Sequence, residues 1–151
     1  MNDAEIYAEL RMDLMRYATA LVGVSDAGDL VSAVVTRVMA KDGLVALKQP
    51  KAYLTRSILN EARMRHRSRT RETRAVLALQ TDAANRRHMD HLDHVLDLVM
   101  DLPPRQRAAV FLTYYEQYTP TEIAGLMGCR AGTVRRYLHL ARAKLRKVID
   151  G

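Results

Sequence analysis

Apolar residues recur every three to four positions along most of the chain, which is the spacing of one face of an α-helix. No segment alternates apolar and polar residues for long enough to predict a β-strand. The pattern therefore predicts an all-α protein. The predicted helices cover residues 4–22, a stretch capped by Ser25, residues 50–72, a stretch from 89 to the Leu-Pro-Pro at 102–104, residues 104–114, and two short helices within 120–138.

Glycines and short polar segments separate these helices. Gly23 ends the first helix, and Ser25 suits the N-cap of the next because its hydroxyl can accept a hydrogen bond from the first turn. Asp26 and Asp29 would then lie in a positively polarised first turn. The segment AKDGLVALKQP predicts a turn at its Asp-Gly, and its final proline suits the first position of the third helix. The helix over residues 104–114 contributes to a predicted core stripe of Phe111, Leu112 and Tyr115.

The predicted third helix changes character halfway along. Five residues of its first half have the spacing of a core-facing stripe: Tyr53, Leu54, Ile58, Leu59 and Ala62. From Arg63 onward, the sequence RMRHRSRTRETR has almost nothing to bury. We expect this half to project into solvent or to lie along a polyanion, and a charged linker is the alternative. Residues 73–88 predict a linker, with a short helical turn at AVLAL.

The charge of the chain is basic and segregated. There are 24 Lys and Arg against 17 Asp and Glu, a formal net charge of +7, which favours anionic partners and nucleic acid first among them. Residues 51–74 contain eight basic and two acidic residues, and residues 129–148 contain seven basic and no acidic ones. The intervening residues 75–104 contain five aspartates. Two cationic blocks separated by an acidic one predict two points of contact with a polyanion.

The sequence does not support several other classes of protein. No stretch approaches the roughly 20 apolar residues of a membrane span, and the N-terminus MNDAEIYAEL is acidic, so we expect a cytoplasmic protein with no membrane partner. The single cysteine, Cys129, excludes an internal disulfide and a multi-cysteine metal site. There is no phosphate-binding loop or nucleophile elbow, so we expect no enzyme activity, cofactor, metal or small-molecule substrate. His88, His91 and His94 could hold a metal, but a solvated helix edge is the preferred interpretation.

The segment PTEIAGLMGCRAGTVRRYL, residues 120–138, predicts a helix-turn-helix. This motif needs a small residue where its helices approach, a turn residue that tolerates positive φ, and apolar residues that lock the two helices at a wide angle. Ala124 and Gly128 supply the first two. The third requirement is met by Ile123, Met127, Cys129, Val134 and Tyr137. A helical hairpin without a DNA-binding role is the alternative.

The second helix of this motif separates a core stripe from a polar face. At about 100° per residue, the stripe consists of Val134, Leu138, Ala141 and Leu145. The first residues of such a helix reach base edges, and later ones lie nearer phosphates. The predicted base readers are Arg130, Thr133, Arg135, Arg136 and His139, followed by Arg146 and Lys147 near the phosphates. Leu140 is an apolar residue on the same polar face.

Three stretches together resemble one family. They are DAGDLVSAVVTRVMAK, KAYLTRSILNEARMRHRSR and the C-terminal pattern LPPRQR…TPTEIAGLMGC…GTV…ARAKLR. They are similar to the bacterial extracytoplasmic-function (group IV) sigma factors of the sigma-70 superfamily, over nearly the whole chain. The resemblance implies two small helical domains: a region 2 bundle at residues 1–72 and a region 4 helix-turn-helix at residues 89–151, joined by a linker at 73–88.

In that family, region 2 binds the clamp helices of RNA polymerase and opens the promoter at the minus-ten element, and region 4 reads the minus-thirty-five element. The resemblance implies core RNA polymerase, promoter DNA and an anti-sigma factor as partners, and association with the nucleoid when active. It assigns to the polymerase-binding helix Asp26, Asp29, Leu30 and Val34. It assigns to the melted minus-ten strand Arg56, Asn60, Arg63, Arg65 and Arg67.

The chain departs from the family pattern at three places. These are Ser32-Ala33 in place of Gln-Glu, Tyr53-Leu54 in place of Trp-Leu, and Tyr137 and Leu140 at positions that are often basic. Two other functions stay open. A dimeric helix-turn-helix repressor or activator would leave residues 26–74 without a role. A sigma-like adaptor would occupy polymerase without opening promoters, which the change at residues 32–33 supports.

Overall fold

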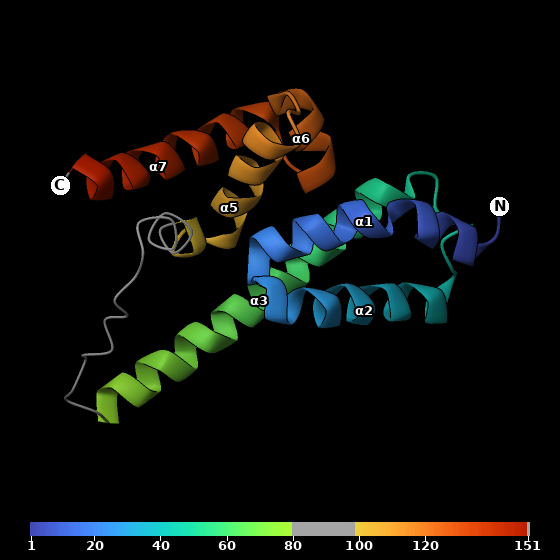
Figure 1. Cartoon of the computed structure of the whole chain (residues 1–151), viewed down its shortest axis with the longest axis horizontal. Coiled ribbons are helices and arrows are strands. Elements are labelled where there is room, and N and C mark those ends of the chain that lie inside the picture. Colours follow the sequence, from blue (N-terminus) through green and yellow to red (C-terminus); the bar gives the residue numbers. More distant parts are fainter. Residues whose placement is uncertain (80–98, 151) are drawn as a thin grey trace.

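The computed structural model describes residues 1–79 and 99–150, and every regular element in these two ranges is helical (Figure 1). The prediction of an all-α protein is thereby confirmed. The helix predicted from residue 89 lies mainly outside the described residues, as do His88, His91 and His94. The elements are α1 (Asp3–Val22), α2 (Val24–Lys41), α3 (Pro50–Leu79), α5 (Pro104–Val110), the π-helical turn η1 (Phe111–Tyr115), α6 (Pro120–Met127) and α7 (Ala131–Asp150).

Gly23 joins α1 to α2 without a loop. Its φ of 89° is a conformation that side chains disfavour, and its N–H donates to the Thr19 carbonyl at 2.8 Å, which ends α1. α2 begins at the next residue, Val24, with Gly23 in the cap position and no side-chain cap. The predicted cap at Ser25 is therefore wrong, because one glycine both ends α1 and starts α2.

The helices α1, α2 and α3 form a bundle around one apolar core. Burying each large aliphatic side chain contributes about 1.5–3 kcal/mol relative to leaving it exposed. At the end of the bundle, the Asp3 carboxylate accepts hydrogen bonds from the backbone N–H groups of Leu44 and Val45, both at 2.9 Å. The buried core consists of Leu14, Tyr17, Ala18, Leu21, Ala27, Leu30, Val31, Val34, Val35, Leu44, Leu54, Ile58, Leu59 and Ala62, with Ala108 of α5.

The helix α3 is longer than predicted, because it continues to Leu79 through the first seven residues of the predicted linker. Four of the five predicted core residues in its first half are buried. Tyr53 is the exception: its side chain is 45% exposed, so its assignment to the core is wrong. Its position shares the outer face of α3 with Asn60 and Met64, which line the same surface recess.

The arginine-rich half of α3 is mostly exposed, as predicted, but two of its arginines are also paired with α2. Arg65 donates to the Asp29 carboxylate of α2 at 2.9 Å, and Arg69 donates to Asp26 at 2.6 Å. Glu61 of α3 also accepts from Arg65, at 3.4 Å. The acidic start of α2 therefore acts as an internal counter-charge for α3.

The helices α5, α6 and α7 surround a second core, which consists of Ala109, Leu112, Ile123, Ala124, Val134 and Leu138. Pro104 begins α5 as predicted, and the helix widens from Phe111 into η1. Tyr115 is 60% exposed, so its assignment to the core is wrong; its ring stacks on Phe111, with the ring centroids 4.9 Å apart.

The two helical units lie against each other. α5 contacts α1 and α3, and α6 contacts α3. Figure 1 shows α5 and α6 beside α1 and α3, whereas α7 runs away from them toward the C-terminus. Phe111 belongs to the boundary of both cores, and its ring stacks on buried Tyr17 of α1 at a centroid distance of 6.2 Å.

Candidate nucleic-acid interface

The geometry of α6, the turn and α7 is that of the predicted helix-turn-helix. α6 begins with a capping box, in which Thr119 Oγ1 accepts from the Glu122 N–H at 3.3 Å and the Glu122 carboxylate accepts from the Thr119 N–H at 3.1 Å. Gly128 has a φ of 73°, and its N–H and that of Cys129 donate to the Ala124 carbonyl at 2.9 and 3.0 Å. Backbone hydrogen bonds thus fix the corner between the helices.

Apolar side chains lock the two helices as the sequence predicts. Ile123 and Val134 are completely buried, and Met127, Cys129 and Tyr137 pack at the edge of the same core.

Burial raises the pKa of the Cys129 thiol, and the charge of Arg105 acts in the opposite direction. A protonated, partly buried thiol fits the structural role predicted for this cysteine.

The predicted DNA-reading residues lie on the solvent side of the motif. Val134, Leu138 and Ala141 are buried on the opposite side of α7. Thr133 is half-buried, and Leu140 is 39% exposed. The exposed candidates are Arg130, Arg135, Arg136, His139, Arg146 and Lys147. Arg130 directly precedes α7, and the next three lie in its N-terminal half, from which a recognition helix contacts base edges.

Two other basic residues of α7 are bound by their own unit, which the sequence did not indicate. Arg142 Nε donates to the Tyr114 hydroxyl at 2.7 Å, and its guanidinium lies 5.5 Å from the centre of that ring. Lys144 donates to the Asp101 carbonyl at 3.3 Å. These contacts brace α7 against η1 and the turn before α5, and they distinguish Arg142 and Lys144 from the cations without such a partner among the described residues.

The basic block of residues 51–74, which lies on α3, meets the helix-turn-helix across a recess of about 360 Å³. One wall holds Arg56, Asn60 and Arg63 of α3, and the other holds the turn of the motif with Tyr137 of α7. The pKa of Arg63 is lowered by burial and then by the positive charges of Arg105 and Arg67. Residues predicted to hold the minus-ten strand therefore lie beside the predicted minus-thirty-five reader, which the sequence did not predict.

The predicted minus-ten residues differ in their exposure and in whether they are already paired. Asn60 and Arg67 are exposed, Arg63 is half-buried, and Arg65 is paired with Asp29. Arg56 donates from both Nε and Nη2 to the Gly125 carbonyl of α6, at 3.1 and 2.7 Å.

The predicted polymerase-binding residues divide into two groups. Leu30 and Val34 are 0% and 1% exposed, so they lie on α2 as core residues, and their assignment to the polymerase-binding helix stays a prediction. The physical reason for their burial is their register, since they repeat on the face of α2 that packs in the bundle core. Asp26 and Asp29 are accessible, but each is paired with an arginine of α3.

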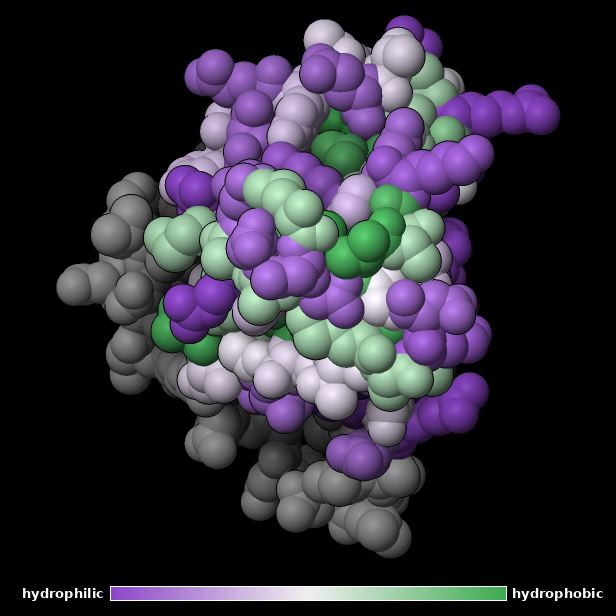
Figure 2. Space-filling view, turned by 90° about the vertical axis from the view of Figure 1, so that its right-hand side faces the viewer, coloured by the Kyte–Doolittle hydropathy of each residue, from purple (hydrophilic) through white to green (hydrophobic). Residues whose placement is uncertain are grey.

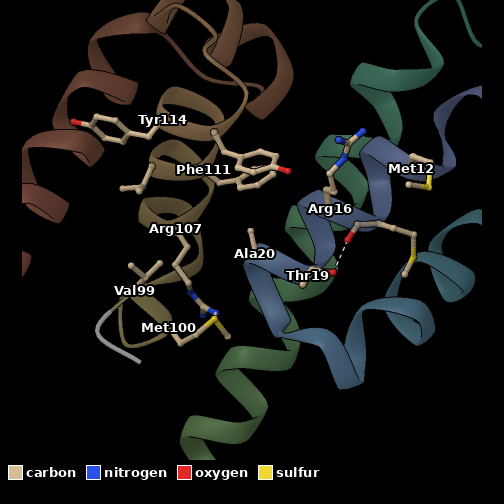
Figure 3. Close-up of a pocket in the computed structure, with 12 residues that line it drawn as sticks. Met12, Arg16, Thr19, Ala20, Val99, Met100, Arg107, Phe111 and Tyr114 are labelled. Carbon is tan, nitrogen blue, oxygen red and sulfur yellow. Dashed lines mark hydrogen bonds between the residues drawn. The ribbon is translucent and has the colours of Figure 1, made fainter. Parts of the chain in front are cut away.

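An apolar cleft of about 550 Å³ lies between α1 and the α5–η1 segment (Figure 3). Arg107 reaches its end from α5. Its Nε donates to the Leu102 carbonyl at 2.8 Å, and Nη1 donates to the Leu21 carbonyl of α1. Burial lowers the pKa of Arg107, and the charge of Asp101 opposes this. Arg107 therefore ties the two units together, a role that its sequence context of alanines did not indicate.

The described residues were also compared with the requirements of a membrane span and of a metal site. No described helix is long and apolar enough to cross a membrane. Among the same residues, no group of three His, Cys, Asp or Glu side chains could hold a metal ion. Figure 2 shows one face of the molecule, on which hydrophilic side chains surround small, separate groups of hydrophobic ones.

Comparisons with known proteins point to one family. Residues 92–145 match the family described as sigma-70, region 4. An RNA polymerase sigma-E factor of Streptomyces avermitilis is 33% identical over 152 residues, which cover 97% of this chain and 84% of that protein. The protein of the same name from Streptomyces coelicolor is 34% identical over 149 residues, covering 95% and 84%.

One solved structure has the same fold over almost the whole length. It is the sigma factor RpoE in complex with the anti-sigma factor NepR, from Bartonella quintana. The TM-score is 0.66 with 22% sequence identity, and the alignment covers 97% of each chain.

Proposed function

The chain belongs to the extracytoplasmic-function sigma factors of RNA polymerase, and we propose that its two basic surfaces divide promoter recognition between them. In this proposal α7 reads the minus-thirty-five element, and the outer face of α3 holds the minus-ten strand. The acidic start of α2 contacts polymerase. The proposal assigns no catalytic chemistry to the chain, because polymerase forms the phosphodiester bonds.

The observation that carries the proposal is the division of α7 into two faces. Arg135, Arg136 and His139 are exposed near its N-terminus, while Val134 and Leu138 are buried on the other side. A helix of this kind fits the major groove, where arginine can donate two hydrogen bonds to guanine. Arg146 and Lys147, farther along α7, are the proposed phosphate contacts.

The outer face of α3 suits a melted strand. Asn60 and Tyr53 both line a recess of about 460 Å³ on this face. An unstacked base can stack on an aromatic ring and form hydrogen bonds with an amide, and arginines such as Arg63 hold the backbone. The exposure of Tyr53, which the sequence did not predict, thus supports its use as a stacking surface in place of the family's tryptophan.

Asp26 and Asp29 are the proposed polymerase contacts on α2. They are accessible and lie near the N-terminal end of the helix. Leu30 and Val34 support them from the core instead of touching polymerase. Ser32, which replaces a longer polar residue of the family pattern, is exposed on the same helix and removes one possible contact.

The remaining assignments follow from the same function. Residues 1–72 act as region 2 and residues 89–151 as region 4, with residues 73–88 as the connection. Because polymerase and promoter are the partners, the chain works in the cytoplasm, on the nucleoid. An anti-sigma factor is a further proposed partner, since the Bartonella relative of the same fold forms such a complex.

Reconstituted transcription tests the proposal. The purified chain is mixed with core RNA polymerase and promoter fragments, and transcripts are scored. We expect initiation that depends on both. Footprints on duplex DNA without polymerase, and no transcripts with it, would instead indicate a dimeric repressor or activator. Polymerase binding without transcripts would indicate an adaptor. Either result contradicts the proposed function.

A further inference from the structure

The exposed face of α7 has an apolar centre between two cationic ends. Arg136 lies near the N-terminal end of this face and Lys147 near the other, and both are exposed. Between them, the exposed residues on the same face are His139, Leu140 and Ala143. Among the described side chains of α7, which end at Lys147, Leu140 is the only large apolar one that is exposed, at 39%.

The two basic residues that follow Leu140 most closely do not cover it. Arg142 donates to the Tyr114 hydroxyl at 2.7 Å, and Lys144 donates to the Asp101 carbonyl at 3.3 Å. Both side chains are thus held by their own unit. The centre of the face is left apolar, and Leu140 is available to whatever this face binds.

The helical register places Leu140 in line with the predicted base readers. It follows Arg136 by four residues and Thr133 by seven, and both intervals return to the same face of an α-helix. Four residues span about 6 Å along the helix, and stacked base pairs are about 3.4 Å apart, so the two side chains face positions roughly two base pairs apart.

The charge of this face indicates DNA as the surface that Leu140 meets. No acidic residue occurs between Ala131 and Lys147, whereas exposed cations lie on both sides of Leu140. A face of this kind attracts a polyanion. When the cations at both ends contact the DNA, the apolar centre lies against the base edges in the groove between them.

Thymine is the base that a leucine can recognise in the major groove. It alone presents a methyl group there, while the other base edges consist mainly of hydrogen-bond donors and acceptors. Leucine offers no partner to such groups, so covering them would cost free energy. Covering a methyl group removes apolar surface from water on both sides of the contact, and one methyl group corresponds to about a fourfold change in affinity.

We propose that Leu140 is a specificity-determining residue of the minus-thirty-five reader, and that it selects thymine by packing against the 5-methyl group. The thymine lies roughly two base pairs from the position that Arg136 reads, toward the C-terminal end of α7. This inference rests on the proposed promoter function. It deepens that function by naming a base and the group on the base that is recognised.

Replacing thymine with deoxyuridine tests the proposal, because it removes the methyl group and leaves the hydrogen-bonding groups of the base pair unchanged. The promoter fragment that supports transcription is prepared with one deoxyuridine at a time in the minus-thirty-five element footprinted by the holoenzyme, on either strand. Gel shift measures holoenzyme binding to each fragment. We expect a thymine at which the replacement weakens binding about fourfold.

Leu140→Ala identifies the side chain responsible for this loss. The variant holoenzyme should bind the unmodified fragment about fourfold more weakly, and deoxyuridine should then have no further effect, because the methyl group no longer has a partner. Arg136→Ala is the matched control on the same face. It should weaken binding to every fragment but keep the deoxyuridine effect, since Leu140 is still present.

The outcomes separate this inference from the promoter function. The inference is wrong if the element contains no thymine, if no deoxyuridine weakens binding, or if the same loss persists in the Leu140→Ala holoenzyme. Equal weakening of Leu140→Ala on both kinds of fragment, together with weaker binding to core polymerase, would identify a protein contact instead. A holoenzyme that gives no transcripts and binds matched and mismatched elements equally would overturn both proposals.

Discussion

The arginines of α3 and those of α7 differ in how many of their proposed DNA contacts are already paired within the molecule. Along α7, Arg135 and Arg136 are exposed. Along α3, by contrast, Arg56 and Arg65 already have partners, at Gly125 and Asp29. Two helices with similar arginine content therefore present different surfaces. Charge in a sequence shows where a polyanion is attracted, but the neighbours of each helix decide whether the charge is available.

The neighbours explain the difference. The buried side of α7 faces the apolar core of its own unit, so its polar side has no competing acceptor among the described residues except near Arg142 and Lys144. α3 is flanked by the acidic start of α2 and by the carbonyl end of α6. In the proposed function α7 would bind DNA directly, whereas the paired arginines of α3 would first have to exchange their internal partners for it.

The largest expected effect is on stability, and it comes from truncating a buried side chain of α7 that packs in the second core. Leu138 is 4% exposed, and Leu138→Ala should lower the free energy of unfolding by about 2–5 kcal/mol, because it leaves a cavity in the second core. Urea denaturation followed by circular dichroism measures this. Leu140→Ala, on the exposed side of the same helix, should change it by less than about 0.5 kcal/mol. Equal losses in both variants would contradict the separation of the two faces.

The reading face itself is tested by Arg135→Ala and Arg136→Ala. Each should weaken binding to a minus-thirty-five duplex by about 1–3 kcal/mol if the side chain contacts a base. Fluorescence anisotropy with matched and mismatched duplexes measures both affinity and preference. Arg11→Ala removes an exposed charge from α1 and is the control for net charge. If sequence preference stays unchanged in both α7 variants, they are not base readers.

On α3, Asn60→Ala should impair promoter opening more than closed-complex formation. The amide is proposed to bind a base that is available only after melting, and one such hydrogen bond contributes about 0.5–1.5 kcal/mol. Permanganate footprinting reports opening, and gel shift of the holoenzyme on duplex promoter reports the closed complex. Ser68→Ala is an exposed control on the same helix. Equal loss in both steps would argue against strand capture by Asn60.

Local sequence features predicted the helices and the helix-turn-helix well. Helical spacing located the apolar stripes, and Pro50, Pro104 and Gly128 marked starts and a turn whose geometry is local. The predictions failed where exposure depends on a distant neighbour. Tyr53 and Tyr115 have the spacing of core residues, yet they are 45% and 60% exposed. Periodicity within one helix cannot show which part of its apolar face is covered.

The same limit applies to the candidate site. The exposed residues of α7 follow from the position of one stripe within one helix, so the sequence could predict them. The pairing of Arg56 with Gly125 joins positions 69 residues apart, and that of Arg65 with Asp29 joins positions 36 apart. Such pairs depend on how whole helices pack, and nothing in the local pattern indicates them.

The smallest expected effect concerns the ion pairs between α2 and α3. It tests whether Asp29 of α2 weakens strand binding by pairing with Arg65 of α3. Asp29 is 77% exposed and its pair with Arg65 is therefore worth only about 0.2–1 kcal/mol. Asp29→Asn should strengthen binding of the free chain to a single-stranded minus-ten oligonucleotide by about that amount, because Arg65 is released. It should weaken binding to core polymerase, because a proposed contact is lost. These opposite signs distinguish an aspartate that both pairs with Arg65 and contacts polymerase from one whose ion pair is only structural.

A double-mutant cycle with Arg65→Ala is the control. The gain in strand binding should vanish in that background. A gain that persists without Arg65 would mean that general repulsion between Asp29 and DNA is the cause.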